Sequence, residues 1–138
     1  MIFQQTLNFH TEGRGTINIS RQLNTIVSTS GISTGIANIF VRHTSASLIL
    51  CENADPTVRR DLEAFMSKVT PDGDPLYQHT DEGPDDMSAH VRTVLTDSSL
   101  SIPFTNGQLL LGTWQGIFLW EHRTQTHNRQ IIISLYGE

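Results

Sequence analysis

Four of the six histidines in this chain lie in segments rich in other polar side chains, and they are the residues best suited to metal chemistry. They are His43, His79, His90 and His122. A neutral imidazole nitrogen is a common ligand for zinc-class metals, and three protein ligands with one open position are typical of a catalytic zinc site. No two of these histidines show a close ligand spacing such as His-x-x-x-His. The competing interpretation of each one is a surface or hydrogen-bonded structural histidine.

The segment from residue 77 to residue 90 combines two of these histidines with several carboxylates. His79 lies where aspartate and glutamate crowd a stretch with little apolar content. Asp86 precedes His90 by four residues, so on a helix the two share one face and the carboxylate could orient the imidazole. Asp86 is also a catalytic candidate. The competing interpretation is that Asp85 or Asp86 simply caps the helix.

The segment around His43 offers hydroxyl groups and a nearby acid. Thr44, Ser45 and Ser47 could bind a phosphate or order water. A nucleophilic serine is less well supported, because no Gly-x-Ser-x-Gly turn is present. Glu52 follows a hydrophobic run, at a strand end where functional residues tend to lie, and is the preferred general acid or base. A solvated strand-end glutamate is the alternative.

Residues 112–116, Gly-Thr-Trp-Gln-Gly, form the other unusual segment. The two glycines permit a close backbone approach, and Trp114 could stack on an aromatic ligand with Thr113 and Gln115 beside it. Asn53, after Glu52, is a further polar candidate for substrate binding. A tight turn whose Trp114 fills the core is the competing interpretation.

The hydrophobic pattern indicates the elements that must position these residues. The predicted strands span residues 3–9, 17–19, 36–41, 47–50, 100–104, 117–123 and 130–136, with a hairpin turn at Asn106-Gly107. A short helix fits residues 23–27. A longer helix is expected over residues 55–69, since Asp55 can cap it and Pro56 suits the first helical position. Its apolar stripe is Val58, Leu62, Phe65, Met66 and Val69.

A long polar loop then leads to a second helix over residues 86–95, with Met87, Val91, Val94 and Leu95 expected to face the core. Strands at both ends with two main helices between them predict an α+β fold. The expected architecture is one antiparallel or mixed sheet covered by helices on one face.

Composition narrows the class of protein. At 138 residues with 37% hydrophobic side chains, the chain suits one folded domain over residues 1–138. No apolar run reaches the ~20 residues of a membrane helix, so no membrane partner is expected. The formal net charge of −5 argues against nucleic-acid binding. Cys51 is the only cysteine, and the first residues lack a signal-peptide pattern, which together predict a cytoplasmic protein.

Taken together, these segments resemble the YjbQ-like family, which is associated with secondary thiamine-phosphate synthase activity. The resemblance runs in order over nearly the whole chain. It is carried by residues 43–48, 52–53, 55–58, 77–79, 82–90, 111–117 and 121–123. It implies a homotrimer with a metal site near the subunit boundaries. By position, the resemblance makes His43, His79 and His90 the metal ligands.

The resemblance implies a transferase that joins a pyrimidine diphosphate to a thiazole phosphate and releases pyrophosphate. Its substrate would be a small phosphorylated heterocycle, and "secondary" suggests a side activity. Histidine ligation suits zinc better than magnesium, which prefers oxygen ligands. Two alternatives stay open from the residues. One is metal-dependent hydrolysis of a small ester or phosphate, and the other is a non-catalytic trimer that binds a metal or a metabolite.

Overall fold

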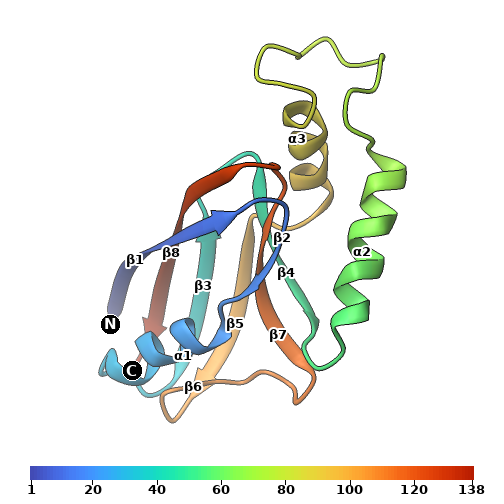
Figure 1. Ribbon diagram of the computed structural model, residues 1–138. Helices are drawn as coiled ribbons and strands as arrows, with labels where there is room; N and C mark the ends of the chain where they lie inside the picture. Colours follow the sequence, from blue (N-terminus) through green and yellow to red (C-terminus); the bar gives the residue numbers. More distant parts are fainter.

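Two curved antiparallel sheets and three helices form the computed structural model, which describes residues 1–138 (Figure 1). The larger sheet has the strand order β1-β8-β3-β5-β6, and the smaller has the order β2-β7-β4. The elements are β1 (Ile2–Glu12), β2 (Gly15–Asn18), α1 (Ser20–Thr29), β3 (Gly35–Val41), β4 (Ala46–Glu52), α2 (Pro56–Val69), α3 (Asp86–Leu95), β5 (Ser99–Thr105), β6 (Gln108–Leu109), β7 (Gln115–Glu121) and β8 (Thr126–Gly137). The predicted α+β class is confirmed.

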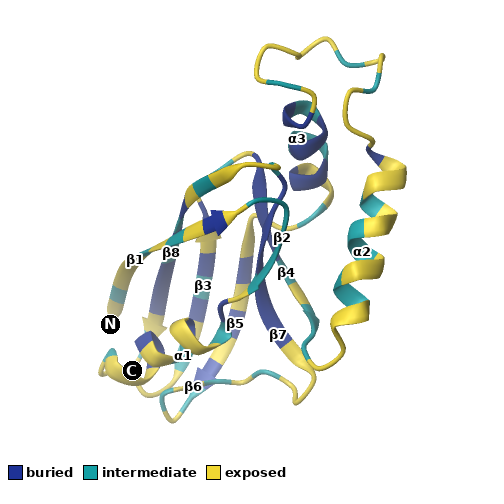
Figure 2. Ribbon diagram, viewed as in Figure 1, coloured by how far each residue is buried: buried dark blue, intermediate teal, exposed yellow.

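The core lies between the concave faces of the two sheets and is closed at one end by α1. Side chains alternate along each strand, so in β3 the residues Ala37, Ile39 and Val41 point inward. The register places Ile39 opposite Ile133 of β8, and both are fully buried. Each such side chain contributes roughly 1.5–3 kcal/mol by its burial. Figure 2 shows buried residues along the strands and on α3, and the largely exposed surface of α2.

Strand β7 is buried on both faces. Ile117 and Leu119 belong to the core, whereas Phe118 and Trp120 point to the opposite face of the smaller sheet. Helix α2 covers that second face: its Arg59 guanidinium lies 4.6 Å from the centre of the Phe118 ring. Helix α3 contacts β4 on the same side. The two main helices therefore cover one face of an antiparallel sheet, as predicted, and the difference from the prediction is that the strands form two sheets.

Helix α2 begins where the sequence predicts, but its predicted apolar stripe is not buried. Asp55 accepts a hydrogen bond from the Thr57 amide at 2.9 Å and Pro56 opens the helix, so both predicted features are confirmed. No α2 residue is fully buried, and Phe65 is 60% exposed. The reason is that polar contacts attach the helix. Glu63 accepts a hydrogen bond from Trp120 Nε1 at 2.8 Å and pairs with Arg92 of α3.

The predicted core face of α3 is wrong. Val94 is 83% exposed and Leu95 is also exposed, while the helix buries Ser88, Ala89 and Arg92. A mainly polar face can be buried here because its groups find partners: Ser88 bonds Asp72, and Arg92 bonds Glu63. Hydrogen bonding therefore outweighs the apolar stripe in orienting this helix. None of the helices has the length and apolar character needed to cross a membrane.

Candidate metal centre

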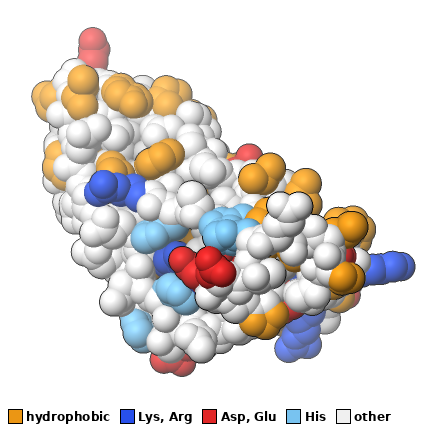
Figure 3. Space-filling view, turned by 90° about the horizontal axis from the view of Figure 1, so that it is seen from above, with side chains coloured by type: hydrophobic (Ala, Val, Ile, Leu, Met, Phe, Trp, Pro, Cys, Tyr) orange, Lys and Arg blue, Asp and Glu red, His pale blue; other side chains and the backbone are white.

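Three side chains at the N-terminal end of α3 form one group of possible metal ligands. His79, Asp86 and His90 each offer a ligand atom, and these atoms all lie within 4.8 Å of one another. Asp86 Oδ2 is 2.7 Å from His79 Nε2 and 3.2 Å from His90 Nε2. Asp86 opens α3 and His90 follows one turn later, while the loop between α2 and α3 brings in His79. Figure 3 shows histidines gathered around acidic side chains on this face.

The hydrogen bond on the far side of the His90 ring fixes where its proton lies. His90 Nδ1 is 2.9 Å from the backbone oxygen of Thr44, which can only accept a hydrogen bond. Nδ1 therefore carries a hydrogen, and the ring turns its other nitrogen, Nε2, toward Asp86. A carbonyl on the remote nitrogen is the usual arrangement for a metal-bound histidine.

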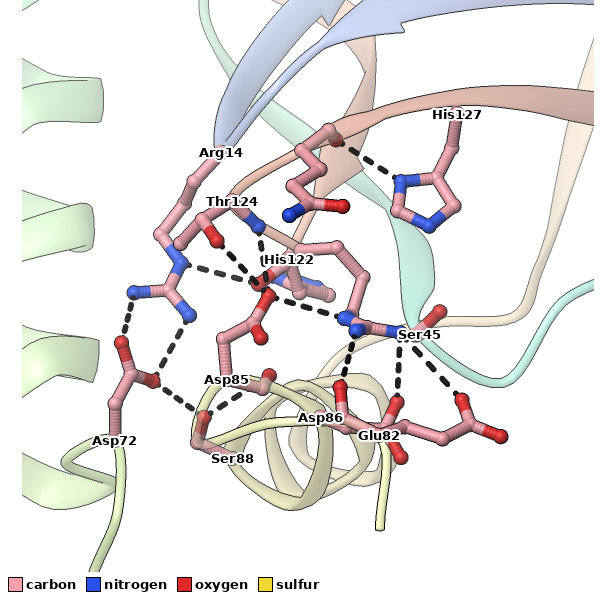
Figure 4. A network of polar contacts seen from close by, with 12 residues as sticks. Arg14, Ser45, Asp72, Glu82, Asp85, Asp86, Ser88, His122, Thr124 and His127 are labelled. Carbon is pink, nitrogen blue, oxygen red and sulfur yellow. Dashed lines mark hydrogen bonds and ion pairs between the residues drawn. The ribbon is translucent and has the colours of Figure 1, made fainter. Parts of the chain in front are cut away.

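Arg123 holds the Asp86 carboxylate, and Asp85 in turn holds Arg123. Arg123 Nη1 donates to Asp86 Oδ1 at 2.9 Å, and its Nε donates to Asp85 Oδ2 at 3.0 Å. The backbone and hydroxyl groups of Thr124 also donate to Asp85 (Figure 4). Burial opposes ionisation of Asp85, but these donors and the Arg123 charge outweigh it and lower the pKa of Asp85 to about 2. The same pairing with Asp85 outweighs burial at Arg123 and raises its pKa.

Asp85 occupies the N-cap position of α3, but its side chain makes no capping hydrogen bond. The interpretation of Asp85 or Asp86 as an ordinary cap is therefore wrong. Both carboxylates form ion pairs with Arg123 instead.

His43 lies outside this group of ligands. Its Nε2 accepts a hydrogen bond from the backbone N–H of Gln130 at 2.8 Å, which occupies the lone pair of this nitrogen. Burial, followed by the positive charge of Arg129, lowers the pKa of His43 and keeps it neutral. The structure thus brings two of the three predicted histidine ligands together with Asp86. The assignment of His43 as a ligand stays a prediction.

The three hydroxyl residues after His43 lie in different environments. Thr44 is exposed and supplies the carbonyl that orients His90. Ser45 is buried and accepts a hydrogen bond from Arg129 at 3.0 Å. Ser47 is fully buried, 2.8 Å from His122 Nε2. Of the three, only Thr44 is both exposed and in direct contact with the ligand group.

His122 is buried completely and cannot join a solvent-facing site. Its Nδ1 has no hydrogen-bond partner, whereas Nε2 meets Ser47. Because an unpaired buried N–H is costlier than an unpaired lone pair, the hydrogen belongs on Nε2. Burial, followed by the charge of Arg92, lowers the pKa of His122 to about 3. The neighbouring Glu121 faces Arg129 instead, as strand alternation predicts.

The remaining predicted residues lie together where β4 ends and β7 begins, at the end of these strands that is far from the metal-ligand group. Glu52 ends β4, roughly 20 Å along the strand from the Thr44 segment. Its carboxylate accepts hydrogen bonds from the backbone amides of Ala54 and Asp55. Glu52 therefore does not contact the metal-ligand group, and its catalytic role stays a prediction. Figure 1 places α3 at the far end of these strands.

The loop before β7 has a defined structure. Asn53 Nδ2 donates to the carbonyl oxygens of Thr113 and Gln115, and Gln115 Oε1 accepts from the Gly112 amide. Trp114 is 64% exposed, so the interpretation that it fills the core is wrong. These residues are brought together with Glu52, and their predicted role in substrate binding stays a prediction.

Sequence reasoning missed how Arg123 holds Asp86 and how the Thr44 carbonyl orients His90. The acidic pair Asp85-Asp86 is plain in the sequence, but its partner Arg123 lies just after β7, 37 residues beyond Asp86. Only the pairing of strands in space connects the two. A backbone carbonyl carries no signal in the amino-acid sequence.

Comparisons with known proteins cover nearly the whole chain. Residues 5–138 match the family model described as UPF0047 protein YjbQ-like. A UPF0047 protein of Synechocystis is 48% identical over 135 residues, covering 98% of this chain and 92% of that protein. The UPF0047 protein YjbQ of Escherichia coli O157:H7 is 40% identical, with both chains fully covered. The chain belongs to the YjbQ-like UPF0047 family, which confirms the resemblance.

Solved structures share this fold. A YbjQ-like protein from Sulfolobus solfataricus superimposes with a TM-score of 0.86 at 26% identity, with 100% of both chains covered. A YjbQ/UPF0047 family protein of Clostridium acetobutylicum gives a TM-score of 0.84 at 34% identity, covering 97% of this chain and 99% of that one.

These comparisons overturn the predicted thiamine-phosphate synthase-type activity. The matching family model and the two relatives carry only the UPF0047 designation, with no reaction. The Sulfolobus protein is described as being of unknown function. The two alternatives, hydrolysis and a non-catalytic trimeric binding role, gain no support from them either. The physical reason for the error is that the order of motifs identifies the family and fold, whereas the reaction depends on a site geometry that motif order does not contain.

Proposed function

We propose that this protein binds a divalent transition-metal ion through His79, Asp86 and His90. The observation that carries the proposal is the position of His90 Nε2. It lies 3.2 Å from Asp86 Oδ2, and because Nδ1 is committed to the Thr44 carbonyl, Nε2 is the ring nitrogen left to bind a cation. Asp86 Oδ2 also meets His79 at 2.7 Å, so one positive ion would satisfy all three side chains.

The separations between these atoms suit a small ion. Two ligands bound to zinc at 2.0–2.1 Å in a tetrahedral arrangement lie roughly 3.3 Å apart. The observed 2.7 and 3.2 Å are close to that value, and the nitrogens of the two histidines, which lie within 4.8 Å of each other, would move closer together around an ion. Two nitrogens and one oxygen favour zinc-class metals over magnesium, which takes oxygen ligands almost exclusively.

Three protein ligands leave one position of a four-coordinate ion open to water or to a ligand. His79 has a side chain that is half exposed, so this position faces solvent. A cavity of about 160 Å³ adjoins His79, with Tyr77, Thr80 and Met87 in its walls. One carboxylate and two neutral imidazoles leave a divalent ion with net positive charge, which favours an anionic group at the open position.

Calorimetric titration of zinc chloride into untagged, chelator-stripped protein tests the proposal. We expect one ion per chain. His90→Ala and Asp86→Asn should each weaken binding by more than the roughly 10–100-fold that loss of an outer-shell partner causes. His10→Ala is the matched control, because His10 is an exposed histidine bonded to Asn128. Unchanged zinc binding by both ligand variants would overturn the proposal.

His43→Ala separates this set of ligands from the three-histidine set that the resemblance implies. If His79, Asp86 and His90 hold the ion, this variant keeps the affinity of the wild type to within about twofold. Loss of binding comparable to that of His90→Ala would make His43 a ligand as well.

A further inference from the structure

We propose that Arg123 is a positioning residue that makes Asp86 offer a single oxygen to the metal ion, and that it thereby sets which metals the site prefers. The inference rests on the proposed metal-binding function. It begins from the division of the Asp86 carboxylate: Oδ1 accepts from Arg123 Nη1 at 2.9 Å, and only Oδ2 faces the two histidines.

Arg123 is itself held too firmly to serve another purpose. Its Nε donates to Asp85 Oδ2 at 3.0 Å and its Nη2 donates to the Glu82 carbonyl at 3.0 Å, while Nη1 holds Asp86. Asp85 is fixed in turn by the Thr124 amide at 2.9 Å. Figure 4 shows the acceptors Glu82, Asp85 and Asp86 close together where the loop leads into α3. Every side of the guanidinium is engaged, so this arginine is not available to bind a substrate.

The consequence follows from the freedom of an aspartate side chain. The terminal torsion of Asp has a broad energy profile, so an unrestrained carboxylate can turn both oxygens toward an ion. Two-oxygen binding would enlarge the coordination shell and suit metals that prefer carboxylate, such as Mn²⁺. With Oδ1 retained by Arg123, the site offers two nitrogens and one oxygen, which suits four-coordinate Zn²⁺ or Co²⁺.

The competing explanation is that Arg123 only attaches the loop to the sheet. Arg14 provides the matched control. Arg14 donates two hydrogen bonds to Asp72 of the same loop, at 2.9 and 3.0 Å. It also donates one to the His122 carbonyl, next to the end of β7, and so ties the loop to the sheet. Arg14 makes no hydrogen bond or ion pair with any of the three proposed ligands. Loss of Arg14 therefore measures attachment of the loop without altering the presentation of Asp86.

The experiment compares Co²⁺ and Mn²⁺ affinities of the wild type, Arg123→Gln, Arg123→Lys and Arg14→Gln. Co²⁺ binding is followed by its visible absorption and Mn²⁺ binding by the electron paramagnetic resonance of the free ion. We expect Arg123→Gln to weaken Co²⁺ binding by about 10–100-fold and to change the absorption spectrum, with a smaller loss for Mn²⁺. Arg14→Gln should lower the melting temperature, with both affinities within about twofold of wild type.

Arg123→Lys carries the same test if Arg123→Gln does not fold. It keeps the positive charge but cannot bridge Asp85 and Asp86 with a planar fork, so the Co²⁺ preference should fall here too. A wild-type Co²⁺ affinity and spectrum in a folded Arg123 variant would overturn this inference and leave the metal site standing. An equal loss of Co²⁺ binding in Arg14→Gln would also overturn it. Failure of the wild type to bind Co²⁺ would overturn both proposals.

Discussion

His122 makes a quantitative prediction about acid stability, because it is a completely buried imidazole that stays neutral in the folded protein. Burial and the charge of Arg92 lower its pKa from 6.5 to about 3. In the unfolded chain the same side chain is solvated and takes up a proton near pH 6.5. Between these two values the unfolded state binds one more proton at this residue than the folded state does.

The sign and size of the effect follow from that difference. His122 imposes no penalty above pH 6.5, and below it the folded state is disfavoured by about 1.4 kcal/mol per pH unit until about pH 3. Between pH 6.5 and 4.5 the loss at this one residue is on the order of 2–3 kcal/mol. This is a large part of the 5–15 kcal/mol by which domains are typically stable.

Replacing His122 by Gln should remove this acid sensitivity. Glutamine does not titrate, and its amide can still donate to Ser47 in place of Nε2. Urea unfolding at pH 7.5 and pH 4.5, at one protein concentration and with chelator present, gives the free energy of unfolding of each variant. The chelator is needed because metal binding is itself pH-dependent. We expect the wild type to lose 2–3 kcal/mol more than His122→Gln between the two pH values.

His10→Gln serves as the control, since His10 is exposed and its replacement should leave the pH dependence unchanged. An equally steep loss of stability in wild type and His122→Gln would refute the reasoning. Nitrogen chemical shifts of the wild type provide a direct second measurement. A His122 ring that is protonated at pH 4.5 in the folded protein would refute it independently.

Three further predictions concern other parts of the molecule. Glu63→Ala should lower the free energy of unfolding in urea by on the order of 3 kcal/mol, because it leaves the buried charge of Arg92 without its ion-pair partner. The control Glu82→Ala, at a mostly exposed side chain, should change it by less than about 0.5 kcal/mol. Equal effects of the two substitutions would contradict this prediction. Trp114→Ala should leave the melting temperature within a few degrees of wild type, because the indole is exposed; a large drop would show a packing role. If the chain forms the trimer that the family resemblance implies, light scattering should give a mass three times the 15.4 kDa of one chain. Phe40→Lys, on the exposed face of the larger sheet, should lower this mass. A monomeric wild type would contradict the prediction.

The sequence predicted local structure well where a single physical signal dominated. Asp55 and Pro56 mark the start of α2 because capping and the missing proline N–H act within one turn. The spacing of Asp86 and His90 likewise placed two candidate metal-binding side chains on one face of α3. Both features depend only on neighbouring residues.

The rest depended on contacts between distant segments. The apolar residues of α3 suggested one buried face, but Arg92 and Ser88 are buried instead because partners on α2 and the following loop satisfy them. Glu52 and His43 flank the same strand in the sequence, and that strand's length keeps Glu52 away from the ligand group. The partner of Asp86 is Arg123, which lies just after β7 and which no local pattern could indicate.

The most direct test of the proposed metal centre is anomalous diffraction at the zinc edge from crystals soaked in zinc chloride. We expect one strong peak per chain at bonding distance, about 2.0–2.2 Å, from one nitrogen each of His79 and His90 and from one oxygen of Asp86. A fully soaked crystal with no peak between these three side chains, or with zinc held by other residues, would contradict it.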